Sequence, residues 1–194
     1  MNHSRQRCAW CLKDNSYIQY HDREWGVPVH QDRKLFEFLI LETFQAGLSW
    51  LTILRKRQNF RNAFDHFDFT TIARYDDRKI ASLLEDPGIV RNRLKIAAAI
   101  ANARAFIAVR EQFGTFNNYI WRFTDGGTIH NHFNSLDEIP ARTDLSDTIR
   151  KDLKQKGFKF VGSTVVYAHM QATGMVNDHL TDCFRHQELL QKFG

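Results

Sequence analysis

Apolar residues recur at helical spacing along most of this 194-residue chain, and this periodicity constrains the fold more than any other feature. Alternating runs of Val, Ile and Thr between turn residues, the usual sign of a strand, are hard to find. Asp32 can cap a helix that Gly47 ends. The residues that fall at i, i+3, i+4, i+7 and i+11 on one face of this helix are Leu35, Phe38, Leu39, Glu42 and Ala46. The sequence therefore predicts an all-α fold.

The other helices are predicted from the same spacing and from their end signals. Ser49 can cap a helix that reaches Phe64, and Gly114 closes a long Ala-rich helix over about 90–113. Further helices are expected near 70–75, near 77–84, from Asp144 or Ser146 to Gly157, and over 162–173, where Gly174 ends the last one. With 16 Phe residues and 43% hydrophobic residues the chain can bury a core, and no linker or repeat divides it. We therefore expect one domain over residues 1–194.

Charge and cysteine content narrow the class of protein. The 27 Lys and Arg residues outnumber the 22 Asp and Glu residues, and the net charge of +5 suits a polyanionic partner. Three cysteines cannot form a closed disulfide framework, so we expect a reducing cytoplasm. The longest apolar tract, 96–109, contains Asn102 and Arg104 and is too short and too polar for a membrane span. No apolar segment of a secretory signal follows residues 1–7.

A carboxylate stands on the apolar face of the first predicted helix. Glu42 follows three aliphatic residues, and a buried carboxylate is costly unless it is paired or hydrogen-bonded. One interpretation is structural: Glu42 caps a backbone group or pairs with an arginine. The other is functional, since the aromatic residues Tyr17, Tyr20, Trp25 and Trp50 flank this helix and could hold a flat ring beside the carboxylate.

A scattered set of Cys and His residues could hold a metal. Cys8 and His21 lie near the N-terminus, and His179 and Cys183 lie near the C-terminus at i, i+4 spacing. Two thiolates and two imidazoles can bind zinc tetrahedrally, although this spacing matches no common zinc finger. Free thiols and surface imidazoles are the alternative interpretation, and Cys11 is a competing ligand.

The segment around Pro87 and Gly88 predicts two helices joined by a tight turn. Such a turn can expose backbone N–H groups, and Arg91, Arg93 and Lys95 follow it directly. Together they could bind a DNA phosphate, a contact that positions the protein without reading base sequence. An ordinary corner between two helices is the alternative.

Taken together, several segments of the chain resemble the DNA-3-methyladenine glycosylase I family of bacterial base-excision repair enzymes. The resemblance rests on 8–10 (CAW), 17–28 (YIQYHDREWGVP), 41–42 (LE), 45–50 (QAGLSW), 86–96 (DPGIVRNRLKI), 156–164 (KGFKFVGST) and 176–179 (VNDH). These segments occur in family order and cover nearly the whole chain.

The resemblance implies a helix-hairpin-helix glycosylase fold with one structural zinc that ties the two ends of the chain together, well away from the chemistry. The helix-hairpin-helix core would span about 32–165, and the tied segments about 8–31 and 166–186. Carried over position by position, the zinc ligands are Cys8, His21, His179 and Cys183. The base pocket then contains Glu42, Tyr20 and Trp50, with Trp10 and Tyr17 close by, and Pro87, Gly88, Arg91 and Arg93 face the DNA backbone.

The implied activity is that of a monofunctional glycosylase. It would flip 3-methyladenine out of alkylated double-stranded DNA and release the free base by hydrolysis, with Glu42 as the catalytic residue. We expect a monomer without a membrane partner. Two other functions stay open at this point: a zinc-dependent hydrolase with Glu42 as its general base, and a non-catalytic helix-hairpin-helix module that only binds DNA.

Overall fold

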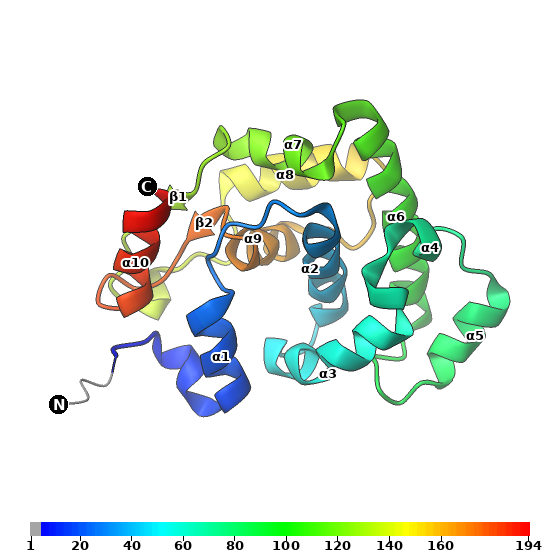
Figure 1. The fold of residues 1–194 in the computed structure, drawn as a ribbon, viewed down its shortest axis with the longest axis horizontal. Helices are drawn as coiled ribbons and strands as arrows, with labels where there is room; N and C mark the ends of the chain where they lie inside the picture. The colour runs from blue at the N-terminus through cyan, green and yellow to red at the C-terminus, as the bar shows by residue number, and fades with distance from the viewer. Residues whose placement is uncertain (1–4) are drawn as a thin grey trace.

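The structure, a computed structural model, describes residues 5–194, and ten α-helices form most of this part of the chain (Figure 1). Residues 1–4, which belong to the N-terminal stretch considered above, lie outside the described residues. The α-helices are α1 (Asn15–Arg23), α2 (Asp32–Gln45), α3 (Trp50–Ala63), α4 (Phe69–Ile72), α5 (Asp77–Glu85), α6 (Arg93–Phe113), α7 (Phe116–Trp121), α8 (Asp144–Gln155), α9 (Ser163–Ala172) and α10 (Phe184–Phe193). The 3₁₀ helices are η1 (Ala9–Lys13), η2 (Asp65–Phe67), η3 (Arg122–Thr124) and η4 (Leu136–Glu138).

The chain is mostly helical, as expected, with one small exception. The two-residue strands β1 (Ile129–His130) and β2 (Val176–Asn177) pair in parallel. This pair holds the connection between η3 and η4 beside the segment that follows α9. This short pair leaves the predicted all-α class intact, and two residues are too few to show a strand pattern in the sequence.

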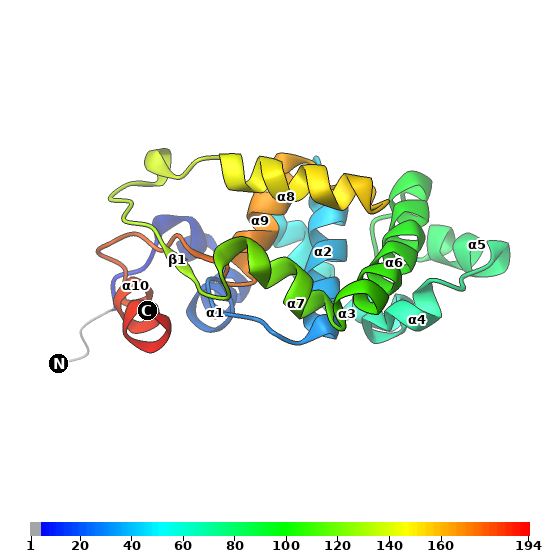
Figure 2. The same cartoon turned by 90° about the horizontal axis from the view of Figure 1, so that it is seen from above.

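Helix α2 lies at the centre of the molecule, where it packs against α3, α6, α7 and α9 (Figure 1). Residues 35–44 of this helix are all buried. Helices α4, α5 and α6 form one end of the molecule, and α1 and α10, from the two ends of the chain, lie at the other end (Figure 2). The central helix thus carries Glu42 into the interior between these two ends.

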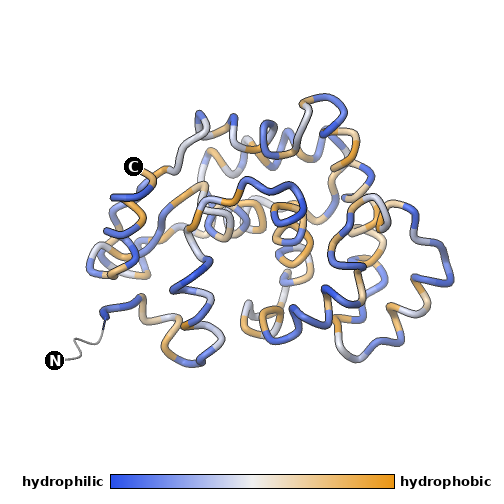
Figure 3. The backbone as a smooth tube through the Cα atoms, viewed as in Figure 1, coloured by the Kyte–Doolittle hydropathy of each residue, from blue (hydrophilic) through white to orange (hydrophobic). Residues whose placement is uncertain are grey.

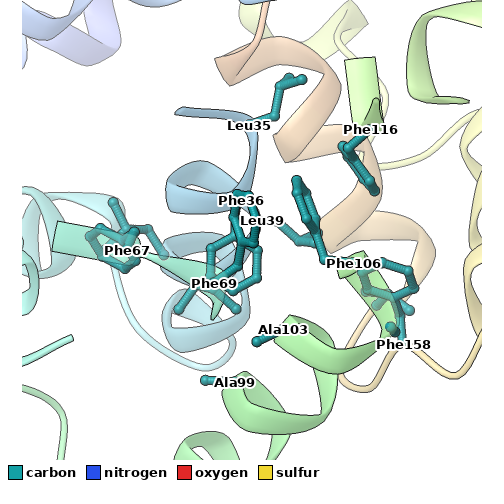
Figure 4. Close-up of a cluster of buried hydrophobic side chains, with 14 of the residues drawn as sticks. Leu35, Phe36, Leu39, Phe67, Phe69, Ala99, Ala103, Phe106, Phe116 and Phe158 are labelled. Carbon is teal, nitrogen blue, oxygen red and sulfur yellow. The ribbon is translucent and has the colours of Figure 1, made fainter. Parts of the chain in front are cut away.

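Aromatic rings build the main core around α2 and α6 (Figure 4). The rings of Phe106 and Phe116 stack with their centroids 4.1 Å apart, and Phe36 meets Phe106 edge-on at 5.0 Å. Ala99 and Ala103 on α6 are fully buried, and their small side chains let this helix approach the rings closely. Hydrophobic and hydrophilic stretches alternate within single helices in Figure 3, as amphipathic helices around a shared core require.

A second buried cluster joins the two ends of the chain. Its members come from the N-terminal segment, α2, α9 and the segment before α10: Cys8, Tyr20, Trp25, Phe38, Ala172, Leu180 and Cys183. This mixture of thiols and aromatic rings differs from the aliphatic and Phe-rich main core. The second cluster therefore places chemically active side chains in the interior.

Two predicted helix ends are confirmed. The Oγ of Ser49 accepts a hydrogen bond from the N–H of Thr52 at 3.2 Å, which caps α3 as expected. Gly114 follows the last residue of α6 with φ = 80°, a conformation that favours glycine.

The predicted cap at Asp32 is wrong, because Gln31 is the N-cap of α2 and Asp32 is already helical. The carboxylate of Asp32 instead accepts hydrogen bonds from the N–H groups of Phe116 and Asn117, at 3.2 and 2.9 Å. These donors belong to the first turn of α7, where backbone N–H groups have no partner within the helix. Asp32 thus stabilises the start of a different helix, far away in the sequence.

Three helices are missing from the sequence-based prediction, namely α1, α7 and α10. The predicted helix over 162–173 is α9, and Gly174, with φ = 70°, follows its end as predicted. It is not the last helix, however, because α10 follows it. These helices are short and carry few aliphatic residues, so packing against the rest of the protein stabilises them more than their own sequence does. Residue 165, near which the predicted core ends, lies in the first turn of α9, and this helix packs against α2 and α8.

None of the helices within residues 5–194 combines the length and the apolar character that crossing a membrane requires.

Candidate active site

A cavity of about 390 Å³ lies between α1, α2, α3 and α9. Its wall consists of Trp10, Tyr17, Tyr20, Trp25, Glu42, Gln45, Trp50, Leu136, Ile139, Ala168 and Gln171. This wall includes every residue expected at a base pocket. Cavities of roughly 300–1,000 Å³ are typical of small-molecule sites. The structure therefore brings one carboxylate and the expected aromatic rings together around a space that suits a ligand.

Glu42 is 3% exposed and has no partner for its buried oxygen. Among residues 5–194, no group donates a hydrogen bond to its Oε2. Burial, with no other contribution, raises the pKa of the Glu42 carboxyl to about 8. A buried carboxylate without a partner lowers stability. A ligand in the cavity that donates a hydrogen bond or carries a positive charge would supply the missing partner.

The structural interpretation of Glu42, as a carboxylate paired with a buried arginine, is wrong. Arg57, which is 6% exposed, pairs with Glu37 at 2.6 Å and with Glu24 at 2.9 Å instead. The charge of Glu42 is thus left unmatched in the described part of the chain.

Aromatic rings surround the carboxylate on several sides. The rings of Tyr20 and Trp50 lie 5.4 Å apart at 51°. Trp10 meets the rings of Tyr17 and Trp25 edge-on, at 5.3 and 5.1 Å. Burial and the neighbouring Glu42 carboxylate both raise the pKa of Tyr20 well above its usual value, so its hydroxyl stays protonated.

Two polar groups of the aromatic wall are free to bind a ligand. The indole Nε1 of Trp50 is buried and has no hydrogen-bond partner among the described residues. The hydroxyl oxygen of Tyr17 accepts a hydrogen bond at 2.9 Å from the N–H of Leu51, one of the unpaired donors at the start of α3. The hydroxyl hydrogen of Tyr17 therefore remains available as a donor. The cavity thus combines a carboxylate acceptor with two candidate donors.

The four predicted metal ligands also come together. The candidate ligand atoms of Cys8, His21, His179 and Cys183 lie within 4.8 Å of one another, and all four residues are buried. The Nε2 of His21 lies 3.2 Å from the Nδ1 of His179 and 3.5 Å from the Sγ of Cys183. Tetrahedral zinc, with its usual bond lengths, needs roughly 3.3 Å between two nitrogens and roughly 3.5 Å between nitrogen and sulfur. The donor set and its spacing therefore fit a metal ion.

Each imidazole of this quartet is held by its other ring nitrogen. The Nδ1 of His21 lies 2.8 Å from Asp22 Oδ1, and the Nε2 of His179 lies 3.0 Å from the carbonyl oxygen of Trp25. Such outer hydrogen bonds orient metal-binding imidazoles. Cys11 is buried as well but is not a member of the quartet, so it does not replace Cys8 as a ligand.

The quartet and the cavity share a wall. The ring of Trp10 lies 5.5 Å from that of His21, and the ring of Trp25 lies 4.6 Å from that of His179. Both tryptophans line the cavity. The expectation that the metal site lies well away from the chemistry therefore needs correction, since a single layer of indole rings separates the two.

The turn at Pro87 and Gly88 is packed rather than open. The N–H of Gly88 donates to the Asp86 carboxylate at 2.7 Å, and Lys56 donates to the carbonyl oxygens of both turn residues. A Cβ on Gly88 would meet the Asp86 carboxylate oxygen at 2.8 Å and the Asn59 side chain at 3.1 Å, so glycine is favoured here. The prediction that this turn presents free N–H groups is therefore wrong for Gly88.

The three basic residues that follow the turn have different surroundings. Lys95 is 7% exposed, and its Nζ donates to the carbonyl oxygens of Phe44 and Ala46 at 2.8 and 2.6 Å. These are unpaired acceptors at the end of α2. The prediction that Lys95 contacts phosphate is therefore wrong, whereas Arg91 and Arg93 are exposed.

Residues that the sequence did not indicate complete the site. A shallower hollow shares Glu42 and Gln45 with the main cavity and continues along Ala46, Gly47, Leu48, Thr164, Val165 and Ala168. It brings the loop after α2 next to the first turns of α9. Ala168 and Gln171 are three positions apart and therefore lie on one face of α9. This spacing is the sequence signal that could have indicated that α9 lines the cavity.

Known proteins resemble this chain over nearly its whole length. The sequence profile of a family described as methyladenine glycosylase matches residues 10–186. DNA-3-methyladenine glycosylase 1 of Escherichia coli strain K12 is 45% identical over 178 residues, which are 92% of this chain and 95% of that protein. A crystal structure of 3-methyladenine DNA glycosylase I is 51% identical, with a TM-score of 0.89 over 92% of this chain and 98% of the other.

A more distant structure agrees. It shows the 3-methyladenine DNA glycosylase I of Staphylococcus aureus and concerns the recognition of 3-methyladenine. The two chains are 34% identical, with a TM-score of 0.89 over 92% of this chain and 95% of that one. On these similarities in sequence and fold, the chain belongs to the methyladenine glycosylase family.

Proposed function

We propose that this protein flips 3-methyladenine out of alkylated double-stranded DNA and releases it by hydrolysis of the N-glycosidic bond, which begins base excision repair. The observation that carries the proposal is the unpartnered carboxylate of Glu42 inside a cavity of aromatic rings. The Escherichia coli relative is named for this activity, and the Staphylococcus aureus structure concerns recognition of this base.

Selection of the damaged base follows from charge. Methylation at N3 makes the adenine of an intact nucleotide cationic, whereas normal adenine is neutral. The cation supplies the countercharge that Glu42 lacks, and the adenine edge can donate hydrogen bonds to the carboxylate. Binding then lowers the pKa of Glu42, so its proton is released as the base enters. A neutral base gains much less from the same pocket.

The rings of Tyr20 and Trp50 hold the flipped base. Extrusion of a base from the duplex costs a few kcal/mol, and a damaged base is easier to extrude than a normal one. Stacking on these rings offsets part of this cost, and a cation over an aromatic face gains about 0.5–2 kcal/mol. Trp10 and Tyr17 close the pocket beside them.

The activation barrier for cleavage of the N-glycosidic bond needs little further lowering, because the cationic base leaves as a neutral molecule. Glu42 is the catalytic residue: it touches the base, and its negative charge faces the positive charge that moves onto the sugar as the bond breaks. A water molecule then adds to the sugar carbon. No lysine lines the cavity of the described chain, and the amine of Lys95 is bound to carbonyl oxygens. We therefore propose base release without strand cleavage.

A zinc ion bound by Cys8, His21, His179 and Cys183 would stabilise the fold and take no part in the reaction. Four protein ligands leave no open position, whereas catalytic zinc keeps one. Glu42 is not part of this quartet, which disfavours the alternative of a zinc-dependent hydrolase. A module that only binds DNA would not need the unpartnered carboxylate of Glu42, which disfavours this alternative as well.

DNA would approach over the face where α2 ends. Arg91 and Arg93 are exposed there and would contact phosphates, while the turn at Pro87 and Gly88 supports them. The Lys95 amine holds the start of α6 against the end of α2, and Ala46 at that end lines the hollow beside Glu42, which supports an approach of DNA over this face. We propose a helix-hairpin-helix core over about 32–165, tied segments over about 8–31 and 166–186, and a monomer that works in the cytoplasm, where its free thiols stay reduced.

Incubation of the protein with methylated duplex DNA tests the proposal. We expect free 3-methyladenine in the supernatant and no cleaved strands. With a chelator, we expect release to follow the fraction of folded protein, whereas a zinc hydrolase would stop while still folded. A folded protein that binds the DNA but releases no base would refute the glycosylase function and favour the binding module.

A further inference from the structure

Arg57 on α3 joins two other helices inside the protein. Its Nε donates to Glu37 of α2 at 2.6 Å, and its Nη1 donates to both carboxylate oxygens of Glu24, at 3.0 and 2.9 Å. Glu24 is the residue that ends α1. A guanidinium group can satisfy two carboxylates in this way because its donors point in fixed directions. One side chain thus ties α1, α2 and α3 together.

This junction lies directly behind the aromatic wall of the cavity. The guanidinium of Arg57 sits 5.0 Å from the centroid of the Phe38 ring. Phe38 is fully buried in the second cluster, together with Tyr20 and Trp25, and Trp50 packs against that cluster. A change in the position of Arg57 therefore reaches the base-binding rings through one layer of contacts.

Other contacts also hold this end of α1: Lys34 of α2 donates to Glu24 at 3.2 Å, and the ring of His21 packs against that of His179. The N–H of Glu24 donates to the carbonyl oxygen of Tyr20 at 2.9 Å, so the two residues move together. The other polar links from α1 to α3 lie nearer its N-terminus, at Tyr17 and at the ion pair between Asp14 and the largely exposed Arg55. Within the described residues, the bridge from Arg57 to Glu24 is therefore the polar link between α3 and the Tyr20 end of α1.

The bridge is charged, and its two ends differ in burial: the side chain of Arg57 is 7% exposed and that of Glu24 is 33% exposed. Burial alone would raise the pKa of Glu24, but Arg57 and Lys34 hold it below its usual value, so the carboxylate is ionised. The Nη2 of Arg57 is buried without a hydrogen-bond partner in the described chain. Apolar side chains often stabilise such a position as well as a buried ion pair does. The defined geometry of the bridge, rather than stability alone, therefore accounts best for these residues.

Resting on the proposed function, we propose that Arg57 is a positioning residue for base recognition. Through Glu24 it sets the separation of the Tyr20 ring from Trp50 and from Glu42, and so the width of the slot that receives the base. Arg57 itself does not line the cavity and touches no base.

The variant Glu24→Gln tests this role, because it keeps the shape of the side chain and removes the charge that holds Arg57. The matched control is Arg61→Gln. Arg61 donates to Glu37 at 2.8 Å but makes no ion pair with α1 within residues 5–194. Binding of free 3-methyladenine, measured by tryptophan fluorescence, and excision from methylated DNA are compared with the melting temperature of each variant.

We expect Glu24→Gln to weaken base binding and kcat/KM about fivefold to twentyfold, and Arg61→Gln to leave both within about twofold at a similar loss in melting temperature. In a Tyr20→Ala background, Glu24→Gln should cause no further loss of base binding, because the two changes act on the same contact. Equal effects of Glu24→Gln and its control, or full additivity with Tyr20→Ala, would overturn the proposal.

Two further outcomes are distinguishable. If Glu24→Gln does not fold, Arg57→Lys keeps a charge at the junction but cannot bridge both carboxylates, and we expect it to reproduce the loss of base binding. Normal base binding by a folded Arg57→Lys protein would count against the role. If the unaltered protein releases no base, the proposed function fails, whereas normal excision by Glu24→Gln refutes only the positioning role.

Discussion

Two carboxylates on α2 are equally buried but have opposite surroundings. Glu37 is 7% exposed and accepts hydrogen bonds from Arg57 and Arg61 at 2.6 and 2.8 Å. Glu42 is 3% exposed, and its inner oxygen accepts none among the described residues. On the same helix, the protein itself supplies cations for the carboxylate of Glu37, whereas the carboxylate of Glu42 is available to a ligand.

This difference shows that burial by itself does not mark a functional acid. A buried carboxylate with matched cations belongs to the architecture, and one without a partner is a candidate for recognition or catalysis. The quartet of Cys8, His21, His179 and Cys183 resembles Glu37 in this respect, because its ligand atoms lie close to one another inside the protein. Changes at Glu37 and in the quartet should mainly lower stability, and changes at Glu42 should mainly lower activity.

Loss of the metal should have the largest effect. Cys8→Ser should lower the free energy of unfolding by roughly 5 kcal/mol or more, because a bound structural metal stabilises only the folded chain. Excision per folded molecule should fall much less. Calorimetry, metal analysis and an excision assay on the same samples measure this. Cys11→Ser is the matched control, since Cys11 is buried outside the quartet, and equal losses in the two variants would contradict a metal at this place.

The next largest effect is expected at Glu37, the carboxylate of α2 that is paired with arginines. Glu37→Gln leaves Arg57 with one carboxylate, and removal of a partner from a buried ion pair costs about 3–5 kcal/mol. In a protein of this size each kcal/mol shifts the melting temperature by roughly 2–4 °C. Glu42→Gln, measured beside it at pH 7, should not lower the melting temperature. A comparable loss in both variants would remove the distinction between the two carboxylates.

The pH dependence of stability sharpens the same contrast. Burial raises the pKa of Glu42 from 4.5 in the ordinary state to about 8 in the folded protein. Between these values the folded protein holds a proton that the unfolded chain has lost, so stability falls as pH rises, by up to about 1.4 kcal/mol per unit. Relative to Glu42→Gln, the unaltered protein should thus lose stability from pH 5 to pH 8. Parallel melting curves across this range would show that Glu42 is not buried alone.

Glu42→Gln should also impair recognition. A hydrogen bond to a charged group is worth about 1.5–3 kcal/mol, so binding and excision of 3-methyladenine should fall roughly tenfold to a hundredfold. Free-base binding, excision rate and melting temperature are measured on one preparation. Normal excision by a folded Glu42→Gln protein would refute the recognition role.

The smallest effect is expected at the surface. Substitution of Arg91 and Arg93 with Ala should weaken binding to undamaged duplexes of any sequence and reduce the salt dependence by roughly 0.9 per lost phosphate contact. Titrations at several salt concentrations measure the slope. Unchanged affinity for undamaged DNA would show that this face is not the DNA contact, while leaving the pocket interpretation untouched.

The sequence predicted what local spacing determines. The periodicity after Asp32 placed Glu42 on a buried helix face, and Ser49 and Gly114 marked helix ends, because these effects act within one or two turns. The four cysteines and histidines could be proposed as ligands because their chemistry is restrictive.

Contacts between distant parts of the chain were beyond such reasoning. Lys95 appeared to be a phosphate contact, yet its amine binds the carbonyl oxygens of Phe44 and Ala46. Asp32 appeared to cap its own helix, yet it caps α7. A charged side chain can interact with water, with a ligand or with the backbone of a remote helix. Which of these it contacts depends on the groups that the fold brings near it.

The quartet joins residues from the two ends of the chain, and this has a consequence for synthesis on the ribosome. His21 and His179 are 158 positions apart, so roughly 8–30 s separate their emergence at 5–20 residues per second. During that time Cys8 and His21 form only half of the quartet, and Trp25 lacks the imidazole of His179 that it packs against. The residues that line the cavity, the last of which is Gln171, leave the ribosome before Cys183. The quartet that joins the two ends of the chain is therefore completed only after the main helical core and the cavity residues have been synthesised.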